Sequence, residues 1–300
     1  MSSISAVIIT LNEEVNISRA ILSVKPWVDE VVVVDMMSDD RTAEIAVSLG
    51  SRLYEYPRVG FVEPARATAV DYAAGEWVLI LDADEVISCS LGRELRQIAE
   101  RDEADVCHLP RLNYVLGKPM FFGQHSPGRD VQVRFFKKGS LRFSDRIHSF
   151  PEPKTGARVY TVQFAGNRAI HHFHAATASQ LIDKMNRYTT TEAEQILQEC
   201  KRAAPWRLLL FPPVFFIQGY IFNQGWRDGW RGFYWASLMA FYRLTRETKH
   251  LQLFECGPTP AGEAPYSREV TELLHECNDS VSGYPSSHKV DANNAPGILR

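Results

Sequence analysis

The sequence predicts an α/β protein: an open, twisted, mostly parallel sheet flanked by helices, followed by an amphipathic, aromatic-rich helical segment. Three observations predict this class. Short β-branched runs alternate with helical spacings over the first ninety residues or so. The run at 31–34 is an unbroken stretch of valine, as in parallel strands buried on both faces. Aromatic and basic residues concentrate after residue 200.

The elements are expected in strand–helix order, which implies right-handed crossovers between parallel strands. The predicted strands cover residues 6–10, 31–34, 52–56 and 77–81. The first predicted helix follows residue 10, and the next two cover residues 42–49 and 64–74. The first helix is expected to bury Val15, Ile17, Ile21 and Leu22. Residues 105–165 combine short strands with loops, and Ala178–Gln198 returns to helical spacing.

These patterns divide the chain into three parts. Residues 1–200 are expected to form the α/β domain, and residues 201–255 a basic, aromatic helical segment. Residues 256–300 are expected to be a linker and a disordered tail, with one short helix at 267–276.

Charge is unevenly distributed along the chain. The net charge of −3 excludes a strong overall attraction to nucleic acid. Residues 201–249, however, hold eight Lys or Arg and two acids, which indicates an anionic partner for that segment. The five scattered cysteines form no CxxC pair, and no secretory signal is visible. We therefore expect a reducing, cytoplasmic compartment.

Polar residues follow three of the predicted strands. Ligands of open α/β sheets bind at the carboxyl ends of the strands, so these residues are candidates for one site. They are Thr10, Asn12 and Glu13 after the first strand, Asp35 and Asp40 after the second, and Asp82, Asp84 and Glu85 after the fourth.

Asp82 and Asp84 form a D-x-D pair at the end of an apolar strand. Carboxylates with this spacing suit a hard divalent cation, Mg²⁺ or Mn²⁺, that also binds substrate phosphates. Such a cation would neutralise the charge that builds on a diphosphate leaving group. The alternative is that these acids cap the next helix, which is expected to begin near Ser88 or Ser90.

The runs VIITLNEEVNI, VVVVD and WVLILDADE resemble the nucleotide-binding half of inverting family 2 glycosyltransferases, which have the GT-A fold. Within that family the chain most resembles the lipopolysaccharide core glucosyltransferase type. The resemblance implies that residues 1–200 are a nucleotide-sugar-binding catalytic domain.

For Asp35 and Asp40, turn and helix-cap duty is the alternative. Met36 and Met37 stand where the family usually has small residues. The residues implied to bind the nucleotide sugar are Thr10, Asn12, Glu13, Asp35, Asp40, Arg66, Asp82 and Arg134.

The stretch GRDVQVRFFKKG resembles the family's Asp-x-Gln-x-Arg motif, which implies that Asp130, Gln132 and Arg134 lie near the sugar. An inverting displacement needs a base that takes the proton from the acceptor hydroxyl. Asp130 is the candidate for this base, and a surface ion pair with Arg129 or Arg134 is its alternative.

Two histidine-containing stretches add candidates. SDRIHSFPE resembles the family's His-Glu motif, in which His148 would bind the metal or the diphosphate and Asp145 is the competing base. HHFH at 171–174 is interpreted as pocket lining, with a zinc site as the alternative.

Residues 205–242 hold 13 of the 33 aromatic residues. The longest apolar stretch, 208–222, is shorter than the roughly 20 residues that cross a bilayer, and Pro212 and Pro213 interrupt it. Trp and Tyr favour the headgroup level, and Arg extends to anionic lipid. The segment predicts an interfacial or re-entrant pair of helices on the cytoplasmic face of the inner membrane, either peripheral or monotopic.

GWRDGWRGF resembles a Gly-x-x-Asp-Gly-x-x-Gly stretch of family enzymes with lipid-borne acceptors. Packing on the catalytic domain or a second subunit is the alternative.

The leading functional hypothesis is metal-dependent, inverting transfer of a hexose from a nucleotide-diphosphate sugar, expected to be a UDP-sugar. The acceptor is expected to be lipid-linked or of the lipopolysaccharide type. A non-catalytic, membrane-associated scaffold with the same fold is one alternative. Sugar nucleotidyl transfer is another, but TLNEEVNI is acidic and lacks the glycine-rich loop that binds triphosphates.

Overall fold

The computed structural model describes residues 2–58, 63–142, 151–199, 201–257 and 270–271. Within these residues, a ten-stranded sheet has the order β3-β2-β1-β4-β8-β6-β12-β5, with β7 and β11 paired to β6. The sheet strands are β1 (Ile4–Thr10), β2 (Glu30–Asp35), β3 (Arg52–Glu55), β4 (Trp77–Asp82), β5 (Glu85–Ile87), β6 (Val106–Val115), β7 (Lys118–Pro119), β8 (Val131–Lys137), β11 (Val159–Thr161) and β12 (Ile170–Ala175). A separate pair joins β9 (Leu141–Arg142) to β10 (Glu152–Pro153).

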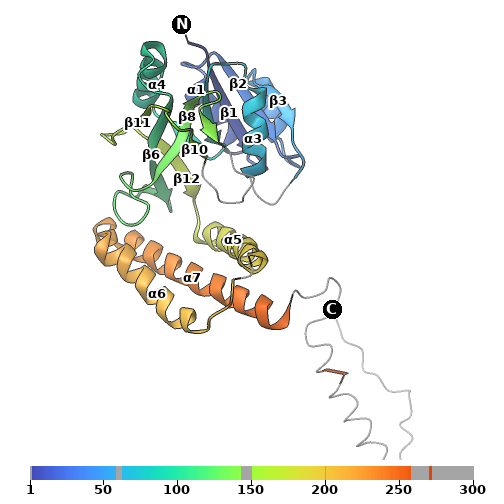
Figure 1. The fold of residues 1–300 in the computed structure, drawn as a ribbon, viewed down its shortest axis with the longest axis vertical. Helices are drawn as coiled ribbons and strands as arrows, with labels where there is room; N and C mark the ends of the chain where they lie inside the picture. The colour runs from blue at the N-terminus through green and yellow to red at the C-terminus, as the bar shows by residue number, and fades with distance from the viewer. Residues whose placement is uncertain (1, 59–62, 143–150, 200, 258–269, 272–300) are drawn as a thin grey trace, which may run out of the picture.

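Helices flank the sheet and then form a separate layer beyond it (Figure 1). Those of the α/β part are α1 (Ile17–Val24), α2 (Thr42–Ser48), α3 (Glu63–Tyr72) and α4 (Cys89–Arg101). Those that follow are α5 (Ala178–Gln198), α6 (Trp206–Ile217), the π-helical turn η1 (Gln218–Phe222), the 3-10 turn η2 (Gly225–Asp228) and α7 (Trp230–Cys256).

The first half of the sheet is parallel, as the sequence predicts. Strands β3, β2, β1 and β4 pair in parallel, and helices α1, α2 and α3 connect them along the chain. The second half is mixed: β8 pairs antiparallel to both β4 and β6, whereas β12 pairs parallel to β6. The prediction of a mostly parallel sheet therefore holds only for the first half. Among the described residues, no helix separates the strands from β6 to β12, which permits antiparallel neighbours such as β6 and β8.

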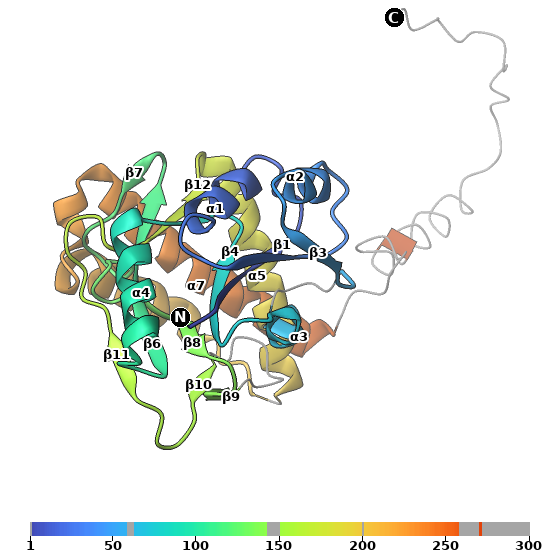
Figure 2. The same cartoon turned by 90° about the horizontal axis from the view of Figure 1, so that it is seen from above.

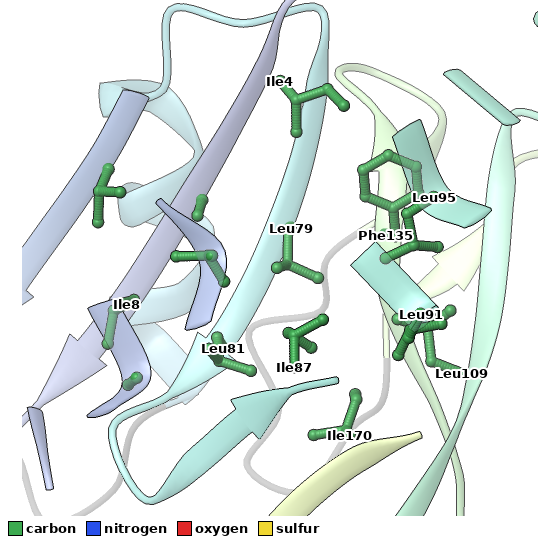
Figure 3. Close-up of a cluster of buried hydrophobic side chains, with 14 of the residues drawn as sticks. Ile4, Ile8, Leu79, Leu81, Ile87, Leu91, Leu95, Leu109, Phe135 and Ile170 are labelled. Atoms are coloured by element: carbon green, nitrogen blue, oxygen red, sulfur yellow. The ribbon is translucent and has the colours of Figure 1, made fainter. Parts of the chain in front are cut away.

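Alternating side chains of the central strands fill two cores, one on each face of the sheet. Ile4, Ile8, Leu79 and Leu81 point to the face covered by α1, α2 and α4 (Figure 3). Their neighbours along the same strands point to the face covered by α3 (Figure 2). Because both faces are buried, the strands are continuously apolar, and this accounts for the valine run in β2.

The apolar face of α1 differs from the predicted one. Ile17 and Ile21 are buried as expected, but Val15 lies before the helix and is exposed, and Leu22 points to solvent. The helix begins at residue 17, so its buried stripe continues through Ala20 and Val24 instead.

The helices after the sheet form a distinct layer. Helix α5 packs on α7, and α7 packs on α6. Pro212 and Pro213 lie inside α6 and do not end it, although the sequence analysis expected an interruption. A proline has the φ of a helix, but it lacks the N–H that bonds four residues back and its ring crowds that carbonyl, so α6 continues with fewer hydrogen bonds. In the described part of the chain, no helix is long and apolar enough to cross a membrane. The predicted linker, short helix and tail at 256–300 lie almost wholly outside the described residues.

Candidate active site

Three parallel strands end side by side at one edge of the sheet. Thr10 at the end of β1 pairs in register with Asp35 of β2, and Ile9 pairs with Asp82 of β4. The sequence-predicted residues therefore converge, because parallel strands present their carboxyl ends to the same edge. Thr10 is buried, and its Oγ1 has no hydrogen-bond partner among the described residues.

The loops after β1 and β2 are tied together by hydrogen bonds. The Asn12 N–H donates to Ser38 Oγ at 2.8 Å, and Asn12 Oδ1 accepts from the Asp39 N–H at 2.8 Å. The Glu13 N–H donates to Thr42 Oγ1 at 2.8 Å. Burial raises the pKa of Glu13 against the opposing effect of a hydrogen bond from Asn16. The two loops therefore form one rigid rim beside the strand ends.

Asp35 stabilises a turn and Asp40 the start of a helix, as in the alternative to nucleotide binding. Asp35 accepts from Ser38 N at 3.0 Å and Oγ at 2.5 Å, which closes the turn after β2. Asp40 accepts from the Thr42 N–H at 3.0 Å, at the start of α2. Hydrogen bonds from Thr42 outweigh burial and lower the pKa of Asp40. The roles of both residues toward a nucleotide stay predictions.

Met37 stands where the family usually has a small residue, in the turn after β2. Its φ is 60°, in the left-handed region that glycine prefers. Met36 is buried in the core, whereas Met37 is exposed at the rim. The turn conformation is therefore kept without glycine, at a cost of about 1 kcal/mol in backbone strain.

Asp82 lies between two arginines. It accepts from Arg66 Nη2 at 3.0 Å and from Arg134 Nη2 at 2.5 Å. Burial opposes ionisation, but Arg134 and Arg66 hold the pKa of Asp82 well below its ordinary value. Arg66, expected to approach phosphates, is thus paired with the first carboxylate of the D-x-D motif. The role of Asp82 at a metal stays a prediction.

The charge pairs continue toward Asp130. Arg134 also contacts Glu85 at 3.3 Å, Glu85 contacts Arg111 at 3.3 Å, and Arg111 contacts Asp130 at 3.0 Å. Asp130 is buried and pairs with Arg111, not with Arg129 or Arg134 at the surface.

Asp130 also accepts from Asn113 at 2.7 Å and from Gln132 at 2.6 Å. Burial raises the pKa of Asp130, but Arg111 and Asn113 outweigh it and the pKa is lowered. Asp130 is therefore ionised at neutral pH and hydrogen-bonded through both oxygens, and its role as the base is untested.

Asp84 occupies a different environment from Asp82. Its Oδ2 lies 3.3 Å from His172 Nε2 and 3.7 Å from Lys184 Nζ. Burial alone would raise the pKa of Asp84, but His172 and Lys184 outweigh burial and lower it to about 2. Ser88 caps α4 by accepting from the Leu91 N–H, so the D-x-D acids do not cap this helix.

Asp84 and His172 fit a divalent cation. His172 Nδ1 lies 2.7 Å from Asn113 Oδ1, an acceptor, so Nδ1 carries a proton and Nε2 is the ring nitrogen that faces Asp84. A bound cation would take Nε2, without its proton, as a ligand. Two donors about 3 Å apart match neighbouring ligands of an octahedral Mg²⁺ site. Among the described residues no group of three His, Cys, Asp or Glu side chains could hold a metal, so phosphate and water would complete the shell.

Successive side chains of the HHFH stretch point to opposite faces of the sheet, because the stretch lies in β12. His172 and His174 point to the site, whereas His171 bonds to Tyr114 and Asn167. His174 Nδ1 lies 3.5 Å from Lys184 Nζ, and burial lowers the pKa of His174 to about 2. The interpretation of this stretch as pocket lining stays a prediction. The sequence analysis missed the pairing of His172 with Asp84, although the spacing of two between His172 and His174 along a strand was a signal that they share a face.

The helical layer borders the site. Trp235 of α7 lies edge-on to His125 at 5.3 Å and to His174 at 5.6 Å between ring centroids. Burial lowers the pKa of His125. The candidate residues Asp145 and His148 lie outside the described residues.

Comparison with known proteins agrees with this geometry. The sequence profile described as glycosyl transferase family 2 matches residues 5–158, which contain both D-x-D acids and Asp130. The chain belongs to glycosyl transferase family 2. It is therefore a glycosyltransferase, as the sequence resemblance implied, and its mixed sheet is GT-A-like.

Individual relatives match a longer part of the chain than the family profile does. An uncharacterized glycosyltransferase of Rickettsia felis is 30% identical over 83% of this chain and 89% of its own. The lipopolysaccharide core biosynthesis glycosyltransferase LpsC of Rhizobium meliloti is 28% identical over 83% of this chain and 92% of its own. Among solved structures, glucosyl-3-phosphoglycerate synthase from Mycobacterium tuberculosis is 23% identical, with a TM-score of 0.33 over 38% of this chain and 44% of that chain. Family membership rests on the sequence matches.

Proposed function

We propose that this glycosyltransferase is metal-dependent and inverting, and that it transfers a hexose from a nucleotide-diphosphate sugar, most simply a UDP-sugar, to a lipid-linked or lipopolysaccharide-type acceptor. One observation carries the proposal. The ionised Asp84 faces the Nε2 of His172 beside Lys184, at the edge where the nucleotide rim ends. The name of the LpsC relative supports the choice of acceptor.

The donor side follows from charge. Lys184 and the Asp84–His172 pair together suit a diphosphate: the pair would hold Mg²⁺ or Mn²⁺, and Lys184 adds a second positive charge. When bound, the cation would supply charge neutralisation to the leaving diphosphate. The residues Thr10, Asn12, Glu13, Asp35 and Asp40 form the rim on which the nucleoside would lie. The unpartnered Thr10 hydroxyl supports a polar ligand there.

The acceptor hydroxyl attacks the anomeric carbon from the face opposite the diphosphate, so the configuration inverts. A new C–O bond forms, the bond to the diphosphate breaks, and the hydroxyl proton passes to a base. For this base we propose Asp130, which is ionised, with Asp145 as its competitor. His148 is proposed to contact the diphosphate or the metal.

Asp84→Asn tests the proposal. It keeps the side-chain shape, and we expect transfer to fall on the order of a thousandfold, because metal-assisted charge neutralisation contributes several kcal/mol. The assay follows release of nucleoside diphosphate from a panel of nucleotide sugars with an extracted lipid acceptor and Mn²⁺. Asp102→Asn is the matched control, since Asp102 is an exposed acid that pairs with Lys137 and Arg158 and belongs to no part of the proposed site. Equal turnover of Asp84→Asn and wild type would reject the site.

Calorimetry separates the proposal from a non-catalytic scaffold with the same fold. We expect UDP to bind the wild-type protein with Mn²⁺ and to bind much more weakly without it. The Asp84→Asn variant should lose this dependence on Mn²⁺. Wild-type protein that binds no nucleotide diphosphate under either condition would favour the scaffold.

A further inference from the structure

Helix α6 has no side that resembles a solvated surface. None of its residues is buried, and it contains no acid. Its outward positions follow the spacing i, i+3, i+4, i+7, i+8 and i+11 of a single helical stripe. These positions are all apolar and exposed: Trp206, Leu209, Leu210, Pro213, Val214 and Ile217. The charged residue of α6, Arg207, lies 3.8 Å from Glu247 of α7, so the outward stripe itself carries no charge. An apolar stripe of this length is normally covered.

The apolar stripe continues past the end of α6. Ile221 and Phe222 of η1, Trp226 of η2 and Trp230 and Phe233 of α7 are also exposed. Together with the outward residues of α6 they form what we call the outer apolar face. Figure 1 shows α6 and α7 at the end of the molecule farthest from the N-terminus. The contacts of α6 are chiefly with α7 and η1, so α6 is not covered by the sheet domain.

Charge identifies what covers this face. Residues 201–227 contain no Asp or Glu. Lys201 and Arg202 precede α6, and Arg227 and Arg231 lie at its other end, with Arg231 stacked on Trp230 at 4.4 Å. The apolar stripe is thus bordered by basic and tryptophan side chains at both ends. This is the pattern of a surface that enters the headgroup region of an anionic membrane.

A second copy of the chain fits this face less well. A two-fold interface brings the same patch of both subunits together. Because both ends of the outer apolar face are basic, parallel and antiparallel pairing of α6 would each bring like charges together.

We propose that the outer apolar face docks on the surface of an anionic lipid bilayer, with α6 lying in the plane of the interface. The opposite side of the same layer borders the active site, because Trp235 of α7 contacts His125 and His174. Docking therefore leaves only the helical layer between the site and the lipid surface. Docking itself is independent of the proposed transfer reaction.

Flotation of the full chain with vesicles tests this inference. The vesicles are phosphatidylcholine alone or phosphatidylcholine mixed with phosphatidylglycerol. The variant is Leu209→Glu/Val214→Glu, whose side chains are 78% and 55% exposed, so the fold does not depend on them. The control is Val47→Glu on α2, which is also 55% exposed. We expect wild type and control to float with the mixed vesicles, and the double variant to bind on the order of a hundredfold more weakly.

The remaining outcomes decide against the inference. Wild-type protein that stays unbound, or a double variant that floats like the control, overturns it. Equal flotation with both kinds of vesicle overturns the assignment to anionic lipid. A wild-type dimer that the double variant converts to monomer, measured by light scattering, would assign the face to a second copy. Donor hydrolysis by the double variant reports on the proposed function separately, since Asp84 and His172 are unchanged.

Discussion

At the scale of single residues, the two aspartates of the D-x-D motif differ by their neighbours. Asp82 is held by two arginines, whereas Asp84 faces an imidazole and an amine. An arginine remains protonated under all ordinary conditions and occupies its partner permanently. The imidazole nitrogen and the lysine amine beside Asp84 can instead exchange this contact for one with a bound ligand. The chemistry of the motif therefore concentrates on Asp84.

Asp130→Asn tests the buried carboxylate next to Arg111. Removing one member of a buried ion pair leaves an uncompensated charge, so we expect about 3 kcal/mol less unfolding free energy at pH 7. The folded-state pKa of Asp130 is lowered, so its stabilisation is present above the ordinary Asp pKa of about 3.9 and is lost as the pH falls through the lower folded value. The difference between wild type and variant should shrink below about pH 4. Urea unfolding at several pH values measures it, and a difference independent of pH would contradict it.

Lys184→Ala tests the cation on α5. Lys184 Nζ lies 3.7 Å from Asp84 and 3.5 Å from His174, so its loss removes positive charge from the proposed diphosphate site. We expect affinity for UDP with Mn²⁺ to fall about tenfold to a hundredfold, as for charged hydrogen bonds. Calorimetry measures the affinity, and Lys154→Ala at an exposed turn is the control. An unchanged dissociation constant would remove Lys184 from the donor site.

Part of the site was visible in the sequence. The strand-end residues Thr10, Asp35 and Asp82 were found because each directly follows an apolar run, and parallel strands bring such ends together. His172 and Lys184 were not assigned, because the pairing of β12 with β6 and β5 that places His172 depends on long-range strand order. Local periodicity contains no information about that order.

At the scale of elements, the stretch GWRDGWRG has a structural explanation. A Cβ on Gly232 would lie 1.8 Å from the carbonyl oxygen of Gly225, and Gly229 has a φ of 65°. Asp228 accepts from the N–H groups of Phe121 and Phe122 at 3.2 and 2.9 Å. The glycines thus allow η2 and α7 to meet, and the aspartate fastens the turn to the loop after β7.

Gly232→Ala should therefore disrupt the contact between η2 and α7. The clash is with backbone, which cannot rotate away, so we expect a loss of about 2 kcal/mol in unfolding free energy. Thermal unfolding of the variant measures the loss. Gly128→Ala is the control, because a Cβ there meets nothing within 4 Å. A Gly232→Ala variant as stable as the control would contradict the close approach.

Helices and strands were predicted well where apolar residues recur at a clear helical or strand spacing. The parallel half of the sheet and α5 appear within a few residues of their predicted ends, since alternation and helical spacing are local signals. The antiparallel placement of β8 was not predicted, because its partners β4 and β6 are chosen by long-range packing. Helix α6 was expected to break at Pro212 and Pro213, but its packing on α7 keeps it continuous.

At the scale of the whole molecule, few contacts fasten the helical layer to the sheet domain. A small cluster joins Met120 and Val115 to Leu181, Trp235 and Leu238. Asp228 adds the two backbone hydrogen bonds at the loop after β7. The layer is therefore coupled to the site through this junction and through Lys184 of α5, which lies 3.7 Å from Asp84.

Asp228→Ala should loosen this junction without unfolding the sheet. We expect faster hydrogen exchange at Phe121, Phe122 and along η2, with unchanged protection in β1 and β4, because the lost bonds are local. Mass-spectrometric hydrogen exchange measures this, and Asp39→Ala serves as the control. Transfer to a lipid acceptor should fall more than donor hydrolysis. Equal protection in both regions would show that the junction does not depend on Asp228.

The alternating charges from Arg66 to Asp130 have a consequence for how this enzyme diversifies. Three arginines and three carboxylates neutralise one another inside the protein, so one change of sign leaves a surplus charge without solvent. Exchanging both members of an ion pair for residues of opposite sign preserves neutrality, whereas exchanging one member does not. Descendants with a different sugar preference are therefore expected to vary at the exposed rim and at Met37, while the interior charges covary in opposite-sign couples or stay fixed.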